Sequence, residues 1–174
     1  MDTVIGTNTG ETLTANNGSG TNTKYDGKGG DDIIKGSTGN DLIIGGAGSD
    51  YMFGGLGADT FQFSKFANNG DHDWVVDFNL ALGDKLDIFN GATIVAANAA
   101  KLGDSTHLGQ DLVNDANVWD LTLTLRVVDG EKNFDYQVTL LDVIKNQTWS
   151  ASEMNVYLES LGYTGGISFG ASPA

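Results

Sequence analysis

The chain has 174 residues, enough for one domain or for one domain with an appended repeat section. Its formal net charge of −14 repels phosphate groups, which argues against nucleic acid as a partner and against binding to anionic membrane surfaces. It has no cysteine for disulfide or thiolate chemistry, and no apolar run of about 18 residues, so no membrane insertion is expected.

Residues 1–26 contain two imperfect copies of a nine-residue unit that becomes regular at Gly27. Glu11 and Thr23 stand at the sixth position, where the regular copies have Asp. We expect these copies to continue the following repeats as an N-terminal cap that binds metal poorly or not at all. A flexible leader over residues 1–24 is the alternative. The segment has no basic region followed by an apolar run, so no cleavable secretory signal is expected.

Four nine-residue units follow one another without a gap over residues 27–62. Each unit has Gly at its first and fourth positions, Asp at its sixth and an apolar residue at its eighth. The aspartates are Asp32, Asp41, Asp50 and Asp59, and the apolar residues are Ile34, Ile43, Met52 and Phe61. Glycine permits turns with positive φ, and the last three residues form a short strand whose middle side chain points inward. Alternating turns and strands predict a parallel coil, whereas a flexible Gly/Asp linker does not explain the apolar eighth position.

Two units make one full coil, so turns two units apart stack on the same side. This stacking places Asp32 near Asp50 and Asp41 near Asp59. Facing carboxylates repel each other, so the arrangement needs a divalent cation. Calcium fits best, because every expected ligand is an oxygen atom and the loops contain no His or Cys.

These units match the pattern GGxGxDxUx and resemble the calcium-binding nonapeptides of the RTX (repeats-in-toxin) proteins, which form a parallel β-roll. The resemblance implies that the four aspartate carboxylates bind Ca²⁺ together with backbone carbonyl groups of the turns. Those carbonyl groups belong to Gly27, Gly29, Gly36, Thr38, Gly46, Gly48, Gly55 and Gly57. Lys28 and Ser37 replace the usual second glycine, and we expect each to weaken its turn without removing a ligand.

The repeat section is predicted to be disordered without metal. Its carboxylates repel one another, and the 25 glycines of the chain raise the entropy that folding removes. Metal binding and folding are therefore expected to be one event.

Several residues beside the inward positions are also apolar, and a bare roll would expose them. They are Ile33, Leu42, Ile44, Tyr51, Phe53 and Phe63. We expect the C-terminal half of the chain to cover at least one outer face of the roll.

Two alternating segments after the repeats, residues 74–79 and 83–88, predict strands. With the preceding residues they resemble the segment that often follows RTX repeats, of the form GADTFxF, then DxxxDF, then GDxLDI. Asp77 and Asp84 hold a further cation by that resemblance, and ordinary turn or strand-end roles are the alternative.

The region 65–149 is predicted to be a β-rich capping region, following the roll over residues 27–64. The run Ile94–Leu102 favours a short helix ended by Gly103. Leu121–Val127 and Tyr136–Leu140 alternate around an Asp-Gly turn signal, which predicts a β-hairpin with one polar face.

Residues 150–174 are predicted to form an amphipathic helix and an uncharged tail. Ser150 to Glu153 fits a capping box, and Met154 and Leu158 recur on one face until Gly162 stops the helix.

No catalytic constellation is present in the sequence, so an enzyme is not expected. The two histidines, His72 and His107, lie in separate segments without HExxH spacing, and there is no GxSxG or cysteine nucleophile. A free-standing enzyme is the least supported reading.

The sequence therefore predicts an all-β chain: a parallel β-roll with a β-rich C-terminal capping region and one or two short helices. By resemblance it is the C-terminal module of a secreted, extracellular or cell-surface protein such as an adhesin. Calcium ions and a type I secretion apparatus are the implied partners, with the export signal in residues 150–174. A carbohydrate-binding module is the alternative, because Trp74, Trp119 and Trp149 are suited to stack on neutral sugars.

Overall fold

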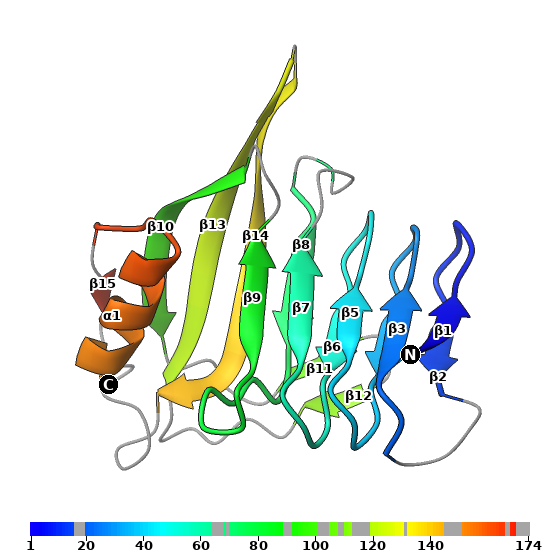
Figure 1. The fold of residues 1–174 in the computed structure, drawn as a ribbon. Helices are drawn as coiled ribbons and strands as arrows, with labels where there is room; N and C mark the ends of the chain where they lie inside the picture. The colour runs from blue at the N-terminus through cyan, green and yellow to red at the C-terminus, as the bar shows by residue number, and fades with distance from the viewer. Residues whose placement is uncertain are drawn as a thin grey trace.

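The structure is a computed structural model that describes most of the chain. The described residues are 1–15, 20–63, 68, 70–88, 92–100, 105–107, 110–112, 119–130, 132–144, 151–165 and 168–169. They form a mostly β fold with a parallel solenoid of about four turns and, within these ranges, a single short helix. The N-terminus lies at one end of the solenoid, and the C-terminal strands and helix lie at the other (Figure 1).

Nine short strands build the coil, and most pair in parallel with the strand two steps further along the chain. They are β1 (Asp2–Ile5), β2 (Thr12–Thr14), β3 (Thr23–Asp26), β4 (Ile33–Lys35), β5 (Leu42–Ile44), β6 (Tyr51–Phe53), β7 (Thr60–Phe63), β8 (His72–Val75) and β9 (Lys85–Ile88). The odd-numbered strands form one sheet in the order β1-β3-β5-β7-β9, and the even-numbered strands belong to a second sheet. Ile34 pairs with Met52 and Ile43 with Phe61, so partners lie two nine-residue units apart, as predicted.

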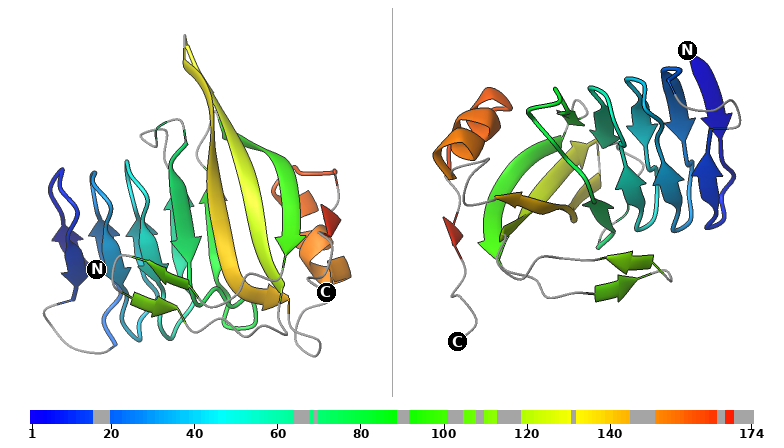
Figure 2. Two further views of the ribbon diagram at one scale, coloured as in Figure 1. Left: turned by 180° about the vertical axis from the view of Figure 1, so that it is seen from behind. Right: turned by 90° about the horizontal axis from the view of Figure 1, so that it is seen from below.

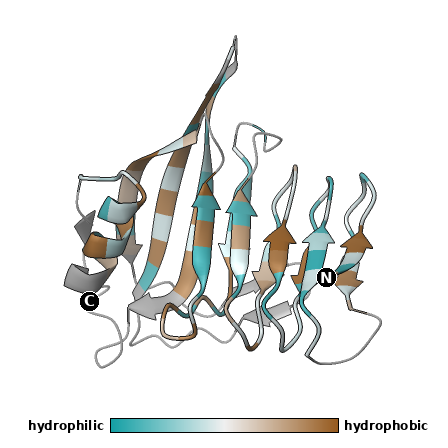
Figure 3. Cartoon of the chain, in the orientation of Figure 1, coloured by the Kyte–Doolittle hydropathy of each residue, from teal (hydrophilic) through white to brown (hydrophobic). Residues whose placement is uncertain are grey.

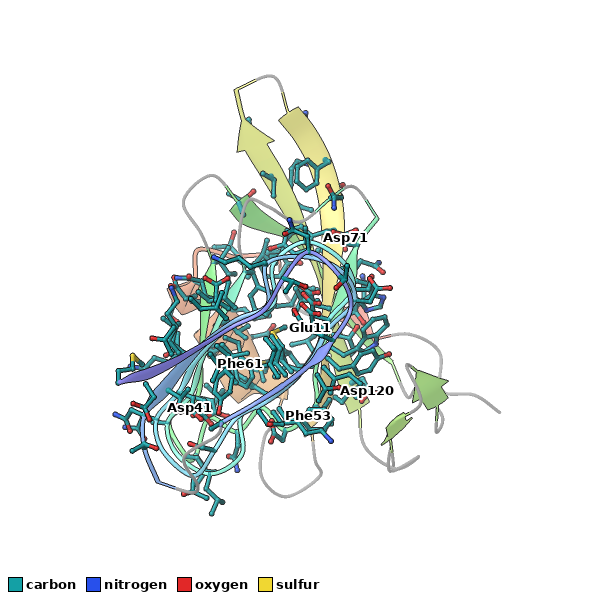
Figure 4. The ribbon with its side chains drawn as sticks, turned by 90° about the vertical axis from the view of Figure 1, so that its right-hand side faces the viewer. Glu11, Asp41, Phe53, Phe61, Asp71 and Asp120 are labelled. Carbon is teal, nitrogen blue, oxygen red and sulfur yellow. The ribbon has the colours of Figure 1, made fainter. Side chains whose placement is uncertain are left out.

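The eighth residue of each unit, and the residue paired with it on β8 or β9, points into the space between the two sheets and is buried. These residues are Leu13, Tyr25, Ile34, Ile43, Met52, Phe61, Val75 and Leu86. One large apolar side chain per strand removes the interior from water, which is the main favourable contribution to folding. Viewed along the coil, Phe61 lies inside it, and Asp41 and Asp71 lie at opposite turns (Figure 4).

The coil is longer than the regular repeats. Strands β1 to β3 lie within residues 1–26, and β8 and β9 continue the coil past residue 64. The boundary expected at residue 64 therefore falls inside the coil. Parallel pairing requires an extended backbone and an inward apolar residue, and neither depends on the glycine pattern that ends there.

The even-numbered sheet continues into the C-terminal half of the chain. Beyond β8 it contains β14 (Lys132–Ile144), β13 (Trp119–Asp129), β10 (Ala92–Ala100) and β15 (Ser168–Phe169). The β8–β14 pairing is parallel, and the β14–β13 and β13–β10 pairings are antiparallel. Figure 2 shows these longer strands curving across the end of the coil. A separate ribbon contains β11 (Ser105–His107) and β12 (Gln110–Leu112).

The predicted hairpin is confirmed as β13 and β14, joined at Gly130. Leu121, Leu123 and Leu125 are buried on one face of β13, in the same hydrophobic cluster as the coil residues Phe61 and Val75. The alternation appears as bands along the long strands in Figure 3. Coil and C-terminal strands therefore share one core.

The helix predicted over Ile94–Leu102 is wrong, because residues 92–100 form β10. This strand pairs along its length with β13 and has a bulge between Ile94 and Ala96. The bulge changes the alternation, so Ile94 and Ala97, three residues apart, are both buried. A spacing of three is typical of a helix, which explains why the sequence pattern was misleading.

The predicted C-terminal helix is confirmed as α1 (Ala151–Ser160). Met154 and Leu158 are buried in the main core, and the Leu86 N–H donates a 2.8 Å hydrogen bond to the Tyr157 hydroxyl. The helix therefore packs on β9, in the last turn of the coil. Gly162, with φ of 90°, follows its end, while Ser150 of the expected capping box lies outside the described residues.

One outer face of the even-numbered sheet is covered, in agreement with the apolar residues found there. Ile33, Tyr51 and Leu141 are buried in a second cluster, with Phe53, Trp74 and Val76 packed against it. Leu141 belongs to β14, so the C-terminal half contributes to this cover.

Candidate metal centre

The sixth residues of the units stack into two ladders, one at each end of the coil's cross-section. On the first ladder each backbone N–H donates to the carboxylate of the next turn. Glu11 donates to Asp32, Asp32 to Asp50 and Asp50 to Asp73, at 2.9 to 3.0 Å. On the second ladder the N–H of Thr23 donates to Asp41, that of Asp41 to Asp59 and that of Asp59 to Asp84, at 2.7 to 2.9 Å. The predicted neighbours Asp32/Asp50 and Asp41/Asp59 are thus brought together.

Each hydrogen bond in a ladder uses only one oxygen of its carboxylate. The second oxygens, Oδ2 of Asp32, Asp50 and Asp59, are buried without a hydrogen-bond partner. The three side chains belong to residues that are at most 1% exposed. A buried carboxylate oxygen without a partner is strongly unfavourable unless a cation compensates it.

The glycine at the first position of each turn makes room for that oxygen. A Cβ atom on Gly27 would collide with Asp32 Oδ2 and with the carbonyl oxygen of Gly45, one coil further on. A Cβ on Gly54 would lie 2.5 Å from Asp59 Oδ2. A carboxylate oxygen of one turn and a carbonyl oxygen of the next therefore converge in a space that only glycine leaves open.

This donor set fits calcium. It consists of carboxylate and carbonyl oxygens from two stacked turns, which are the ligands that calcium accepts in flexible numbers. Among the described residues, no three acidic or histidine side chains converge on one point. A cation here therefore depends on backbone carbonyl oxygens as well as on the aspartates.

Residues 26–61 match the RTX calcium-binding nonapeptide repeat in four copies. The chain therefore contains four RTX calcium-binding repeats. Such repeats bind Ca²⁺, so calcium is the cation of this coil. No curated protein matches the chain.

Burial shifts the protonation of the RTX ladders. Desolvation raises the pKa of Asp32 to about 6 and the pKa values of Asp50 and Asp59 to about 7. Neighbouring carboxylates raise these pKa values further, and the backbone N–H donors lower them in part. The pKa values of Asp73 and Asp84 are also raised, with desolvation as the largest cause. Without a cation, the ionised coil is therefore unfavourable near pH 7.

The carbonyl groups of the RTX turns follow the same stacking. Gly46 and Gly48 lie directly over the carbonyl oxygens of Lys28 and Gly30, and Gly55 and Gly57 lie over those of Ser37 and Gly39. The carbonyl oxygens of Lys28 and Ser37 each accept an N–H from the next turn, from Ala47 and Leu56.

Asp73 was not predicted from the sequence as a ladder residue, whereas Glu11 was placed at the sixth position of an imperfect unit and Asp84 was named as a cation ligand by resemblance. Asp73 stacks on Asp50, Asp84 stacks on Asp59, and Glu11 stacks below Asp32. Asp77 accepts the N–H groups of Gly54 and Gly55 at 2.7 and 2.9 Å. The available signal was an acidic residue two places before an apolar one, as in Asp73 and Val75. Extra residues before these units displaced them from the nine-residue register.

The tryptophans proposed for sugar stacking and the two histidines either contact other side chains or have side chains outside the described residues. Trp74 stacks on Tyr51, with ring centroids 4.6 Å apart, and on His72, at 4.0 Å. His72 Nε2 lies 2.7 Å from the Thr139 hydroxyl. The side chains of Trp119, Trp149 and His107 lie outside the described residues. Carbohydrate binding stays a prediction without support from Trp74.

The raised pKa values predict that, without calcium, protons neutralise part of the carboxylate charge of the ladders. Between about pH 4 and pH 7, the folded calcium-free coil holds protons that the unfolded chain has released, so its stability falls as pH rises through this window. We expect circular dichroism in calcium-depleted buffer to show more β structure at pH 5.5 than at pH 7.5. The variant Asp50→Asn, which cannot ionise, should show a weaker dependence. Calcium-free stability that rises from pH 5.5 to 7.5 would contradict this assignment.

Proposed function

We propose that this chain is a calcium-dependent folding module at the C-terminal end of an extracellular or cell-surface protein exported by a type I secretion apparatus. The observation that carries the proposal is the set of buried carboxylate oxygens without partners on Asp32, Asp50 and Asp59. In this proposal the chain binds calcium and folds, and it carries out no catalysis.

The RTX repeats support the export part of the proposal, because such repeats imply a calcium-binding module of type I secreted proteins. Among the described residues, no helix is both long and apolar enough to cross a membrane. Extracellular calcium modules bind with dissociation constants of about 10⁻⁴ to 10⁻³ M. A coil with sites of that affinity stays unfolded at cytosolic calcium and folds after export.

The packing of the C-terminal strands supports a role as a cap. The last turn of a parallel coil leaves unpaired backbone groups and an open apolar interior. In this chain β14 pairs with β8, and α1 packs on β9 through Tyr157. Folding of the coil and folding of the C-terminal half are therefore coupled through one core.

Calcium is expected to convert the chain from largely disordered to β-rich. Far-ultraviolet circular dichroism during a calcium titration should show a cooperative transition near about 10⁻⁴ to 10⁻³ M. Magnesium at the same concentration should fail, because it dehydrates reluctantly and requires octahedral geometry that stacked carbonyls do not offer. A chain that is fully folded in chelator at pH 7.5 would refute calcium-dependent folding.

Deleting residues 150–174 is expected to abolish secretion through a type I apparatus and to raise the calcium midpoint of the purified protein. The matched control, Met154→Ala with Leu158→Ala, keeps the chain length but removes two buried side chains of α1. We expect this control to raise the calcium midpoint, because such truncations cost about 2–5 kcal/mol each, and to leave the export signal in place. Secretion that survives the deletion would refute an export signal in residues 150–174. An unchanged calcium midpoint in both variants would refute the stabilisation of the coil by the C-terminal helix.

A further inference from the structure

The second residue of each RTX turn takes one of two backbone conformations. In turns 27–32, 45–50 and 54–59 it has a positive φ, of 73° at Lys28, 117° at Gly46 and 89° at Gly55. Thr7 and Ser37 occupy the same place in turns 6–11 and 36–41 and do not have a positive φ. Because φ is the rotation about the N–Cα bond, its sign changes the direction of this N–H relative to the rest of the turn.

The conformation at this position correlates with the partner of the carboxylate in the same turn. Where φ is positive, the outer oxygen of the aspartate is buried without a partner, as at Asp32, Asp50 and Asp59. Where it is not, the N–H of the second residue donates to that oxygen. Ser37 N–H donates to Asp41 Oδ2 at 2.7 Å, and Thr7 N–H donates to Glu11 Oε1. The same arrangement thus occurs in two separate turns.

Ser37 holds turn 36–41 in this form with its hydroxyl group as well. Its Oγ donates to the carbonyl oxygen of Thr21 at 3.1 Å and accepts the Gly39 N–H at 3.0 Å. A Cβ at the first position would lie 3.0 Å from the outer aspartate oxygen in this turn, compared with 2.5 Å in turns 27–32 and 54–59. The Asp41 carboxylate is therefore drawn away from the space that the first glycine leaves open.

We propose that Ser37 closes the gap between Asp41 and Asp59 to calcium, so that turn 36–41 is a metal-free step of the coil. This inference rests on the proposed function, because it states which turns of a calcium-binding coil are loaded. The Ser37 N–H supplies the compensation that a cation supplies elsewhere. A cation entering this gap has to break a hydrogen bond to a carboxylate, which weakens binding roughly 10- to 100-fold.

The neighbouring gap on the same ladder lacks a carboxylate on one side, because Thr23 stands opposite Asp41. On this ladder, the aspartate with a free outer oxygen is Asp59, whose turn stacks against Asp84. The open positions thus lie at Asp32 and Asp50 on one ladder and at Asp59 on the other. Lys28 is not glycine, but it adopts the left-handed conformation, so the outer oxygen of Asp32 in its turn remains available to a cation.

The test is the number of calcium ions bound by the full chain, measured by equilibrium dialysis and by isothermal titration calorimetry at saturating calcium. Ser37→Gly gives turn 36–41 the residue found in turns 45–50 and 54–59, and we expect it to bind one more calcium ion than the native chain. The matched control Lys28→Gly changes the same position of a turn that is already left-handed, so the count should stay the same.

Asp41→Asn supplies a second test that does not depend on creating a site. In the native chain it should leave the calcium count unchanged, whereas in the Ser37→Gly background it should remove the added ion. Loss of one ion from the native chain on Asp41→Asn, or an unchanged count in Ser37→Gly, would overturn the role of Ser37. A native chain that binds no calcium would instead refute the proposed function itself.

Discussion

The buried carboxylate at the sixth position of each turn is the interaction on which this coil depends. One of its oxygens accepts the backbone N–H of the preceding turn on the ladder, so the aspartates connect the turns of the coil. The other oxygen, in three of the turns, has no partner within the protein. The same side chain therefore holds the stack together and makes it unfavourable without a cation. In the proposed function calcium resolves this conflict, and its binding allows a chain with a net charge of −14 to fold into a compact coil.

Burial of the apolar interior stabilises the coil, but it does not compensate the buried carboxylates of the ladders. Each strand contributes one buried side chain between the sheets, and the C-terminal strands extend this core past the last turn. Because β8 pairs with both β6 and β14, the even-numbered strands of the coil and the antiparallel strands belong to one sheet. The packing of α1 on β9 covers the same end. Neutralising the ladders is therefore expected to stabilise the C-terminal half as well as the repeats.

The regular register made much of the fold predictable from sequence. It determined the parallel coil, the pairing of Asp32 with Asp50 and the inward residues such as Ile43. Strand β10 was not predictable by periodicity, because a bulge gives its buried residues a helical spacing. Asp73 was not predicted as a ladder residue, and Asp84 was expected to bind a cation only by resemblance, because extra residues displace both from the nine-residue register.

The sequence also did not predict that Lys28 and Ser37 adopt different backbone conformations. Both replace a glycine, and propensity alone treats them as similar defects. The structure separates them by the sign of φ and by the partner of the adjacent carboxylate. Such a distinction depends on hydrogen bonds between turns, including the one to Thr21, that lie far apart in the chain.

Amide hydrogen exchange at the ladder positions tests the central claim most directly. The N–H groups of Asp32, Asp50 and Asp59 donate to carboxylates that, in this account, need a cation to remain buried in ionised form. At pH 7.5 we predict strong protection of these amides with calcium and exchange close to that of an unfolded chain in chelator. Equal protection of these amides with and without calcium would contradict the account.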